Sequence, residues 1–210
     1  NNKENILGYF AHTIIYAVLV SILITIIGLV FSPILFVLMG SVHEVIVLSL
    51  QYTNVIFAGS IIFIMLVALN SLLHADGDTK TYRNVLILSF FLNIGLNPLF
   101  IFGYGLIPAM GIAGIGVATI VAQFIGLLII FNKVIKSSRI KDISRKYFYP
   151  KVYLLRNLFY QSAPISAALL LISVGNFIIL AYIGVFGEHA TAGYGSAARF
   201  EQILLLPVLG

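Results

Sequence analysis

Residues 9–31 read YFAHTIIYAVLVSILITIIGLVF and contain no Asp, Glu, Lys or Arg. About 20 apolar residues in a helix cross the roughly 30 Å hydrocarbon core of a bilayer. The stretch is about twice as long as a barrel strand, and it does not alternate polar with apolar side chains. Because backbone groups in hydrocarbon must bond internally, we predict that it is a transmembrane helix.

Five further apolar runs have similar lengths, at 52–73, 85–106, 110–132, 158–186 and 190–210. Hydrophobic residues make up 60% of the 210 residues and charged residues only 9%, whereas about 25% of a soluble domain is charged. The sequence therefore predicts an all-α polytopic membrane protein with about six transmembrane helices. The apolar segment 33–50 is interrupted by GSVHE at 40–44, and we expect it to be a connection along the interface.

The basic residues occupy alternate connections between the predicted spans. Eleven lie on one side, and the connections near 33–50, 104–109 and 187–189 contain none. Cytoplasmic loops carry an excess of Lys and Arg, so we expect the basic side to be cytoplasmic and the membrane to be the plasma (inner) membrane. The eleven are Lys3, Lys80, Arg83, Lys133, Lys136, Arg139, Lys141, Arg145, Lys146, Lys151 and Arg156.

The long polar connection after the fourth run holds eight of these basic residues and one acid, Asp142. It could bind anionic lipid or a polyanion, or it could simply fix topology and link two groups of helices. Because the positive-inside bias already accounts for the charges, we favour the second interpretation. The net charge of +5 therefore indicates a lipid bilayer as partner and no nucleic acid.

The sequence offers no sign of an enzyme. It lacks cysteine, which excludes a disulfide framework and a thiolate metal site. It also lacks the H-E-x-x-H, G-x-S-x-G and P-loop motifs, so we expect no catalytic residue, cofactor or metal site. The start lacks an initiator Met and the end lies inside an apolar run, so we interpret the chain as a fragment of a longer protein.

Polar residues cluster in the run 85–106. Ser89, Asn93 and Asn97 are four residues apart and share a helix face. Pro98 lacks an N–H and leaves the carbonyl of Ile94 without its helical donor. Freed carbonyls beside polar side chains form mid-membrane sites in transporters, but amides also join helices by hydrogen bonds. Both interpretations stay open.

The run 110–132 carries small residues at every fourth position, a pattern typical of close helix packing. Thr119 and Gln123 each follow a residue of that stripe by one position. They could face the same interior as Asn93 and Asn97. The stripe consists of Gly114, Ala118, Ala122 and Gly126.

The last two runs contain the remaining candidates for a cation or substrate pathway: Asn176, Arg199 and Glu201. Arg199 and Glu201 are two apart and point to different faces, so each needs its own partner or water. Glu201 could face a hydrated cleft and bind a cation, or it could form a structural pair. Asn176 is a lone amide and could serve helix packing. We expect the four histidines, including His12, to lie at interfaces near helix ends.

Four motifs resemble the multidrug and toxic compound extrusion (MATE) family of cation-coupled antiporters. They read LHADGDTKT at 73–81, LNIGLNPLFIFG at 92–103, MGIAGIGVAT at 110–119 and GYGSAARF at 193–200. The resemblance implies twelve helices in two lobes around a cleft, of which this chain would hold helices three to eight. Residues 1–132 would be the last four helices of the first lobe, 133–157 a basic cytoplasmic inter-lobe loop, and 158–210 the first two helices of the second lobe.

The resemblance also implies efflux of organic, cationic compounds or drugs by antiport with Na⁺ or H⁺, by a protein functional as a monomer when full length. The alternative is a lipid-linked oligosaccharide flippase of the same wider superfamily. Asn97 stands where the family usually has an acid, so no proton can be carried there. The coupling ion therefore stays open between Na⁺ and H⁺.

Overall fold

The computed structural model describes residues 2–105, 107–137, 140 and 143–209, with side chains described only within 4–202. This part of the chain is helical apart from loops and a single bridge between Tyr104 and Ile107. The elements are α1 (Asn2–Leu38), α2 (His43–Ala58), α3 (Ser60–Ala75), α4 (Lys80–Phe102), α5 (Ile112–Ile135), the short 3₁₀ helix η1 (Arg145–Phe148), α6 (Val152–Gly184) and α7 (Glu188–Leu209).

Four helices of the described chain are long and apolar enough to span a membrane: α1, α4, α5 and α6. The bent pair α2 and α3 makes a fifth span if the two are counted together. The run 190–210 lies in helix α7, which is not among the candidates found within the described residues. The all-α membrane class is confirmed, and the described residues contain four or five candidate spans.

The expected interfacial connection at 33–50 is wrong. Helix α1 continues through Pro33 to Leu38, and α2 begins at His43, which leaves a four-residue turn. The hydroxyl of Ser32, beside the proline, donates to the carbonyl of Gly28. The helix ends where Gly40 takes a φ of 74°, the left-handed conformation that commonly closes a helix.

The predicted span 52–73 is broken at Gly59, where α2 and α3 meet at 45°. The bend is stabilised by hydroxyl groups from the adjacent helices. Thr25 of α1 donates to the carbonyl of Phe57 at 2.9 Å, and its Oγ1 lies 2.7 Å from Oγ of Ser60. Ser60 also donates to the carbonyl of Ser21 at 3.1 Å. Side-chain hydroxyls therefore hydrogen-bond backbone groups at a break where water is absent.

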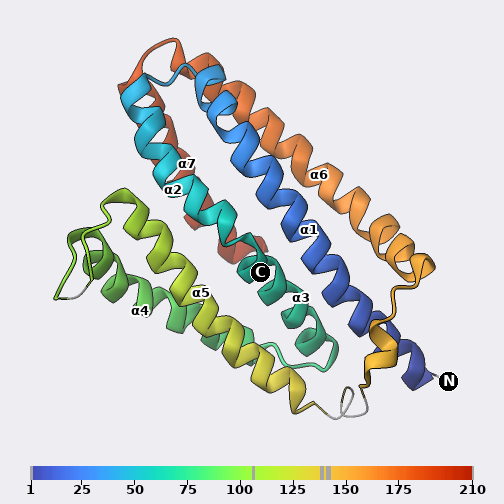
Figure 1. The fold of residues 1–210 in the computed structure, drawn as a ribbon. Helices are drawn as coiled ribbons and strands as arrows, with labels where there is room; N and C mark the ends of the chain where they lie inside the picture. The colour runs from blue at the N-terminus through green and yellow to red at the C-terminus, as the bar shows by residue number, and fades with distance from the viewer. Residues whose placement is uncertain (1, 106, 138–139, 141–142, 210) are drawn as a thin grey trace.

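Helix α5 packs against α2, α3 and α4, and α1 packs against α2, α3 and α6. In Figure 1, α4 and α5 form one side of the bundle and α6 the other, with α1 beside α6. The four small residues of the predicted stripe on α5 are all buried. A Cβ added at Gly114 would lie 2.5 Å from the carbonyl oxygen of Phe100. The packing role predicted for the stripe is confirmed.

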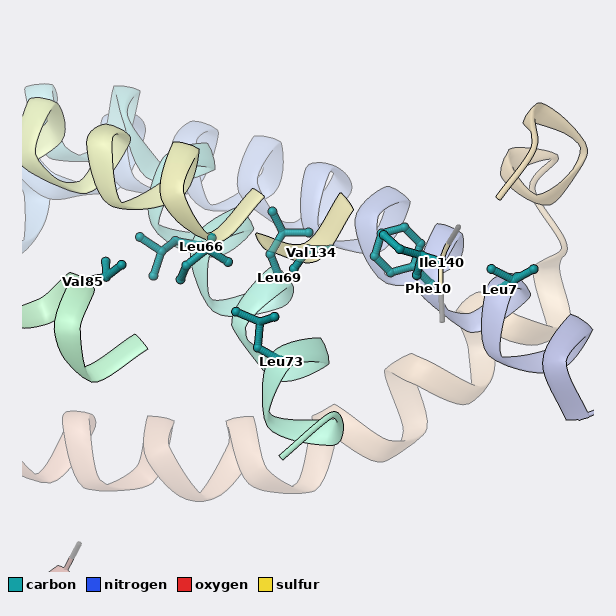
Figure 2. Packing of buried hydrophobic residues seen from close by; sticks show 9 residues of the cluster. Leu7, Phe10, Leu66, Leu69, Leu73, Val85, Val134 and Ile140 are labelled. Atoms are coloured by element: carbon teal, nitrogen blue, oxygen red, sulfur yellow. The ribbon is translucent and has the colours of Figure 1, made fainter. Parts of the chain in front are cut away.

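A cluster of buried apolar side chains joins the ends of α1, α3, α4 and α5 to the loop after α5 (Figure 2). Its members are Leu7, Phe10, Leu66, Leu69, Leu73, Val85, Ile130, Val134 and Ile140. Ile140 belongs to the basic connection, so this cluster packs that connection against the helix ends.

The described basic residues of the connections gather at this same end. Ser137 donates to Asp76 Oδ2 at 2.8 Å, and Lys133 Nζ lies 3.7 Å from Asp78 Oδ2, which links α5 to the turn before α4. The side chain and backbone N–H of Thr81 both donate to Asp78. These bonds, with a smaller contribution from Lys133, lower the pKa of the Asp78 carboxyl. Arg139, Lys141 and Asp142 lie outside the described residues.

The close approach of α4 and α5 predicts different outcomes at two glycines, Gly114 on α5 and Gly95 on α4. Gly114→Ala should cost roughly 1–3 kcal/mol, because the added methyl group meets the α4 backbone. Gly95→Ala on α4 has nothing within 4 Å of its Cβ and should be neutral or slightly stabilising. The free energy of unfolding in mixed detergent micelles measures both, and equal values would contradict this packing.

Candidate functional site

The polar side chains predicted to share a face of α4 meet the polar residue Thr119 of α5. Asn93 Nδ2 donates to the carbonyl of Ser89 at 2.9 Å, which turns its Oδ1 toward α5. Thr119 Oγ1 lies 3.4 Å from that oxygen and 2.9 Å from the carbonyl of Ile115. The hydroxyl of Ser89 reaches the carbonyl of Ala122 at 3.5 Å. This α4–α5 polar cluster follows from the small-residue stripe, which lets the two helices come close enough.

Asn97, one turn further along α4, differs from Asn93. Its Oδ1 is buried and has no hydrogen-bond partner among the described residues. Pro98 follows it in the sequence and supplies no N–H to the helix. Leaving a buried carbonyl oxygen unpaired costs roughly 1–3 kcal/mol. Such an oxygen can accept a bond from a ligand at little further cost.

Gln123 and Asn70 extend the set of polar groups around α5. Gln123 is half-buried one turn along α5 from Thr119. Asn70 of α3 is buried, and its Oδ1 is the second oxygen that has no partner within the described chain. Helix α3 packs against α5, so both orphan oxygens lie on helices that contact α5.

The other candidates do not join this cluster. Asn176 is exposed on α6, and Arg199 and Glu201 are exposed on α7. Helices α6 and α7 pack against each other, and α6 packs against α1. The structure therefore brings Asn93 and Thr119 together, with Asn97 one turn further along α4, and leaves the three candidates of the last two helices apart from them.

Two features escaped the sequence analysis. The first is the hydroxyl cluster at the α2–α3 break, for which the Gly59-Ser60 step inside an apolar run is the only local signal. The second is His12, which we expected at an interface. It is fully buried within α1, with Nδ1 2.8 Å from the carbonyl of Gly8 and Nε2 accepting from the backbone N–H of Lys151 at 2.8 Å.

The chemistry available to the α4–α5 polar cluster is that of neutral oxygens. No group of three His, Cys, Asp or Glu side chains that could hold a metal ion occurs within the described residues. Amide and hydroxyl oxygens coordinate hard cations and accept hydrogen bonds from polar solutes. The cluster can therefore bind an ion or a solute, but its own side chains cannot take up a proton in the ordinary pH range.

Comparison with known proteins places these observations in context. A family model described as MatE matches residues 1–99. Over 99% of its length the chain is 26% identical to the probable multidrug resistance protein YoeA of Bacillus subtilis, and it covers 46% of that protein. Over 87% of its length it is 27% identical to an FAD transporter of Shewanella oneidensis, covering 40% of it.

A solved structure gives the same result for the fold. The structure described as the crystal structure of MATE in complex with MaL6 matches this chain with a TM-score of 0.78 and 27% identity. The match covers 99% of this chain and 46% of the chain in that structure. The chain thus spans less than half the length of these three proteins.

The hydrogen bonds of the two amides predict opposite effects on stability. Asn93→Leu should destabilise the protein by roughly 1 kcal/mol, because it removes bonds to Ser89 and Thr119. Asn97→Leu should be neutral or stabilising, because it removes a buried oxygen that has no described partner. Thermal unfolding of the ligand-free protein in detergent measures both variants. If Asn97→Leu were the more destabilised, the geometry described for Asn97 would be wrong.

Proposed function

Because the chain belongs to the multidrug and toxic compound extrusion (MATE) family, we propose that the full-length protein is a secondary active transporter. It exports organic, mainly cationic compounds or drugs by antiport with Na⁺ or H⁺ across the plasma (inner) membrane. Two relatives support transport of small molecules, but one is named for multidrug resistance and the other for FAD. The substrate class is therefore part of the proposal.

The observation that carries the proposal is the Oδ1 of Asn97, unpartnered within the described residues, one helical turn along α4 from the Asn93 that meets Thr119. A polar group inside a span is costly and marks a pathway when it faces a cavity. We assign this cluster to the binding of a cation or of the polar part of a substrate. Because Asn97 cannot be protonated, Na⁺ is the coupling ion that the cluster itself favours.

We assign a secondary, hydrogen-bonding role in this pathway to Gln123 on α5 and to Asn70 on α3. Glu201 and Arg199 would face the cleft from the second lobe. Both are exposed on α7. A carboxylate or guanidinium within a membrane span costs free energy unless water or a partner reaches it. A water-filled cleft between two lobes would hydrate both groups.

Transport by the full-length protein tests the assignment of the amides. In proteoliposomes with an imposed Na⁺ or H⁺ gradient, Asn97→Leu should reduce movement of a fluorescent organic cation at least about tenfold, the loss of roughly 1.4 kcal/mol of binding. Asn97→Asp restores the acid usual in the family and should make transport respond to the H⁺ gradient. Glu201→Gln in the same assay tests the second-lobe assignment.

Asn84→Leu is the matched control, because Asn84 is an exposed amide near the start of the same helix. It should transport like the unchanged protein. If Asn97→Leu, folded and incorporated normally, transports as well as this control, the cluster is not part of the pathway. If Glu201→Gln transports normally, the role given to Glu201 is wrong.

The distribution of charge predicts that the connection 136–151 is cytoplasmic. In an otherwise cysteine-free full-length protein, Ser144→Cys and Glu188→Cys place single thiols at exposed positions in opposite connections. An impermeant maleimide added to whole cells should label position 188 and not position 144, and disruption of the cells should expose both. Labelling of 144 alone in intact cells would reverse the proposed orientation.

A further inference from the structure

A polar pocket lies at the basic end of the bundle, between the first turns of α1, η1 and the start of α6. Its volume is about 370 Å³, and its lining includes Glu4, Lys146, Tyr147, Lys151, Tyr153 and Leu154. Figure 1 shows η1 beside the first turns of α1, near the end marked N, with α6 beginning further along α1. Nothing in the transport pathway proposed above uses this pocket, which is on the far side of α1 from α4 and α5.

The walls of the pocket are held by specific bonds. His12, fully buried, donates from Nδ1 to Gly8 and accepts the N–H of Lys151 at Nε2. That arrangement fixes the neutral tautomer with its proton on Nδ1 and ties the start of α6 to α1. Nearby, Asn157 Nδ2 donates to the hydroxyl of Tyr9 at 3.3 Å. The pocket is therefore a built feature of the α1–α6 contact and not a gap between loose chains.

The electrostatics of the pocket favour an anion. Lys146 and Lys151 both line it, and so does the start of α6. A helix N-terminus carries partial positive charge and binds phosphate groups readily. Glu4 is the one carboxylate in the lining and opposes an anion. Two ammonium groups and a helix end outweigh it.

The position of the pocket identifies which anion it would meet. The apolar runs within α1 and α6 begin at residues 9 and 158, one to two helical turns beyond Glu4 and Val152, so the pocket lies just outside the run that spans the hydrocarbon. Two exposed tyrosines flank the start of α6, Tyr149 at 79% and Tyr153 at 58% exposed, and the aliphatic Val152 between them is 77% exposed. Tyrosines at this level are typical of the head-group region of a bilayer. A lipid phosphate is therefore at the right depth, with apolar side chains beside it for the acyl chains.

We propose that this pocket binds the phosphate of an anionic phospholipid head group and so anchors the inter-lobe connection to α1. Lys146 and Lys151 contact the phosphate oxygens, Tyr153 lies at the mouth, and the buried Leu154 forms part of the wall. Topology alone could explain the charges of the basic connection, but in this proposal two of its lysines also bind a specific ligand.

Thermal unfolding of the full-length protein in detergent, titrated with phosphatidylglycerol or with phosphatidylcholine of the same acyl chains, tests this proposal. Phosphatidylglycerol should raise Tm and phosphatidylcholine should not. Each lysine near an anionic lipid surface contributes about 1 kcal/mol, so K146Q/K151Q should need roughly 30-fold more phosphatidylglycerol for the same rise. The single variants should each need about fivefold more, which keeps the test available if the double variant does not fold.

K80Q/R83Q is the matched control, because it removes two exposed charges from the same end outside the pocket. It should respond to phosphatidylglycerol as the unchanged protein does, and Glu4→Gln should respond at equal or lower lipid concentration. If K80Q/R83Q and K146Q/K151Q respond alike, the effect is diffuse surface charge and the proposal fails. If inorganic phosphate alone produces the same lysine-dependent rise in Tm, the occupant is a soluble anion and the lipid assignment is overturned.

Discussion

Hydrocarbon offers no hydrogen bond to a peptide group, so every N–H and C=O within a span must find its partner inside the protein. This constraint explains why the described chain is almost wholly helical, and it also explains where its hydroxyl groups lie. At the α2–α3 break, Thr25 donates to the carbonyl of Phe57. Beside Pro33, Ser32 donates to the carbonyl of Gly28. At both places a short polar side chain adds a hydrogen bond to a backbone carbonyl within an apolar run.

The same constraint leads to the candidate site. Apolar side chains gain little from leaving lipid for one another, so helices in a membrane associate through close packing and polar contacts. The small-residue stripe on α5 lets α4 come within contact of its backbone, as the crowding at Gly114 shows. That approach puts Thr119 within reach of Asn93, and the Oδ1 of Asn97, one turn further along α4, is also buried. Packing and site therefore have a common origin in residues that carry no chemistry of their own.

Hydropathy, charge and small-residue spacing were sufficient to predict the class, most of the helices, the packing role of the stripe and the grouping of Asn93 with Thr119. They could not predict the break at Gly59, because its hydrogen bonds come from a neighbouring helix. Nor could they predict that α1 continues through Pro33, since a proline in an apolar run can either end or kink a helix. The burial of His12 also escaped prediction, because its second partner, Lys151, is 139 positions away in sequence. For Arg199 and Glu201 the sequence predicts a free-energy cost, because charged groups inside a span are unfavourable. It does not predict their role, which depends on the groups that surround them in the full-length protein.

An unpartnered oxygen has a consequence for binding as well as for stability. In the state described here Asn97 Oδ1 has lost water without gaining a donor from the described residues, so this state carries a cost of roughly 1–3 kcal/mol. A cation or a donor group that reaches the oxygen relieves that cost, and a ligand that binds one state preferentially stabilises it by the same free energy. Asn93 has its bonds already and would gain less. Of the two amides, Asn97 is therefore the one whose occupancy can shift the balance between conformations of α4 and α5, and the neighbouring Pro98, which breaks the hydrogen-bond ladder of α4, lies where such a shift would be accommodated.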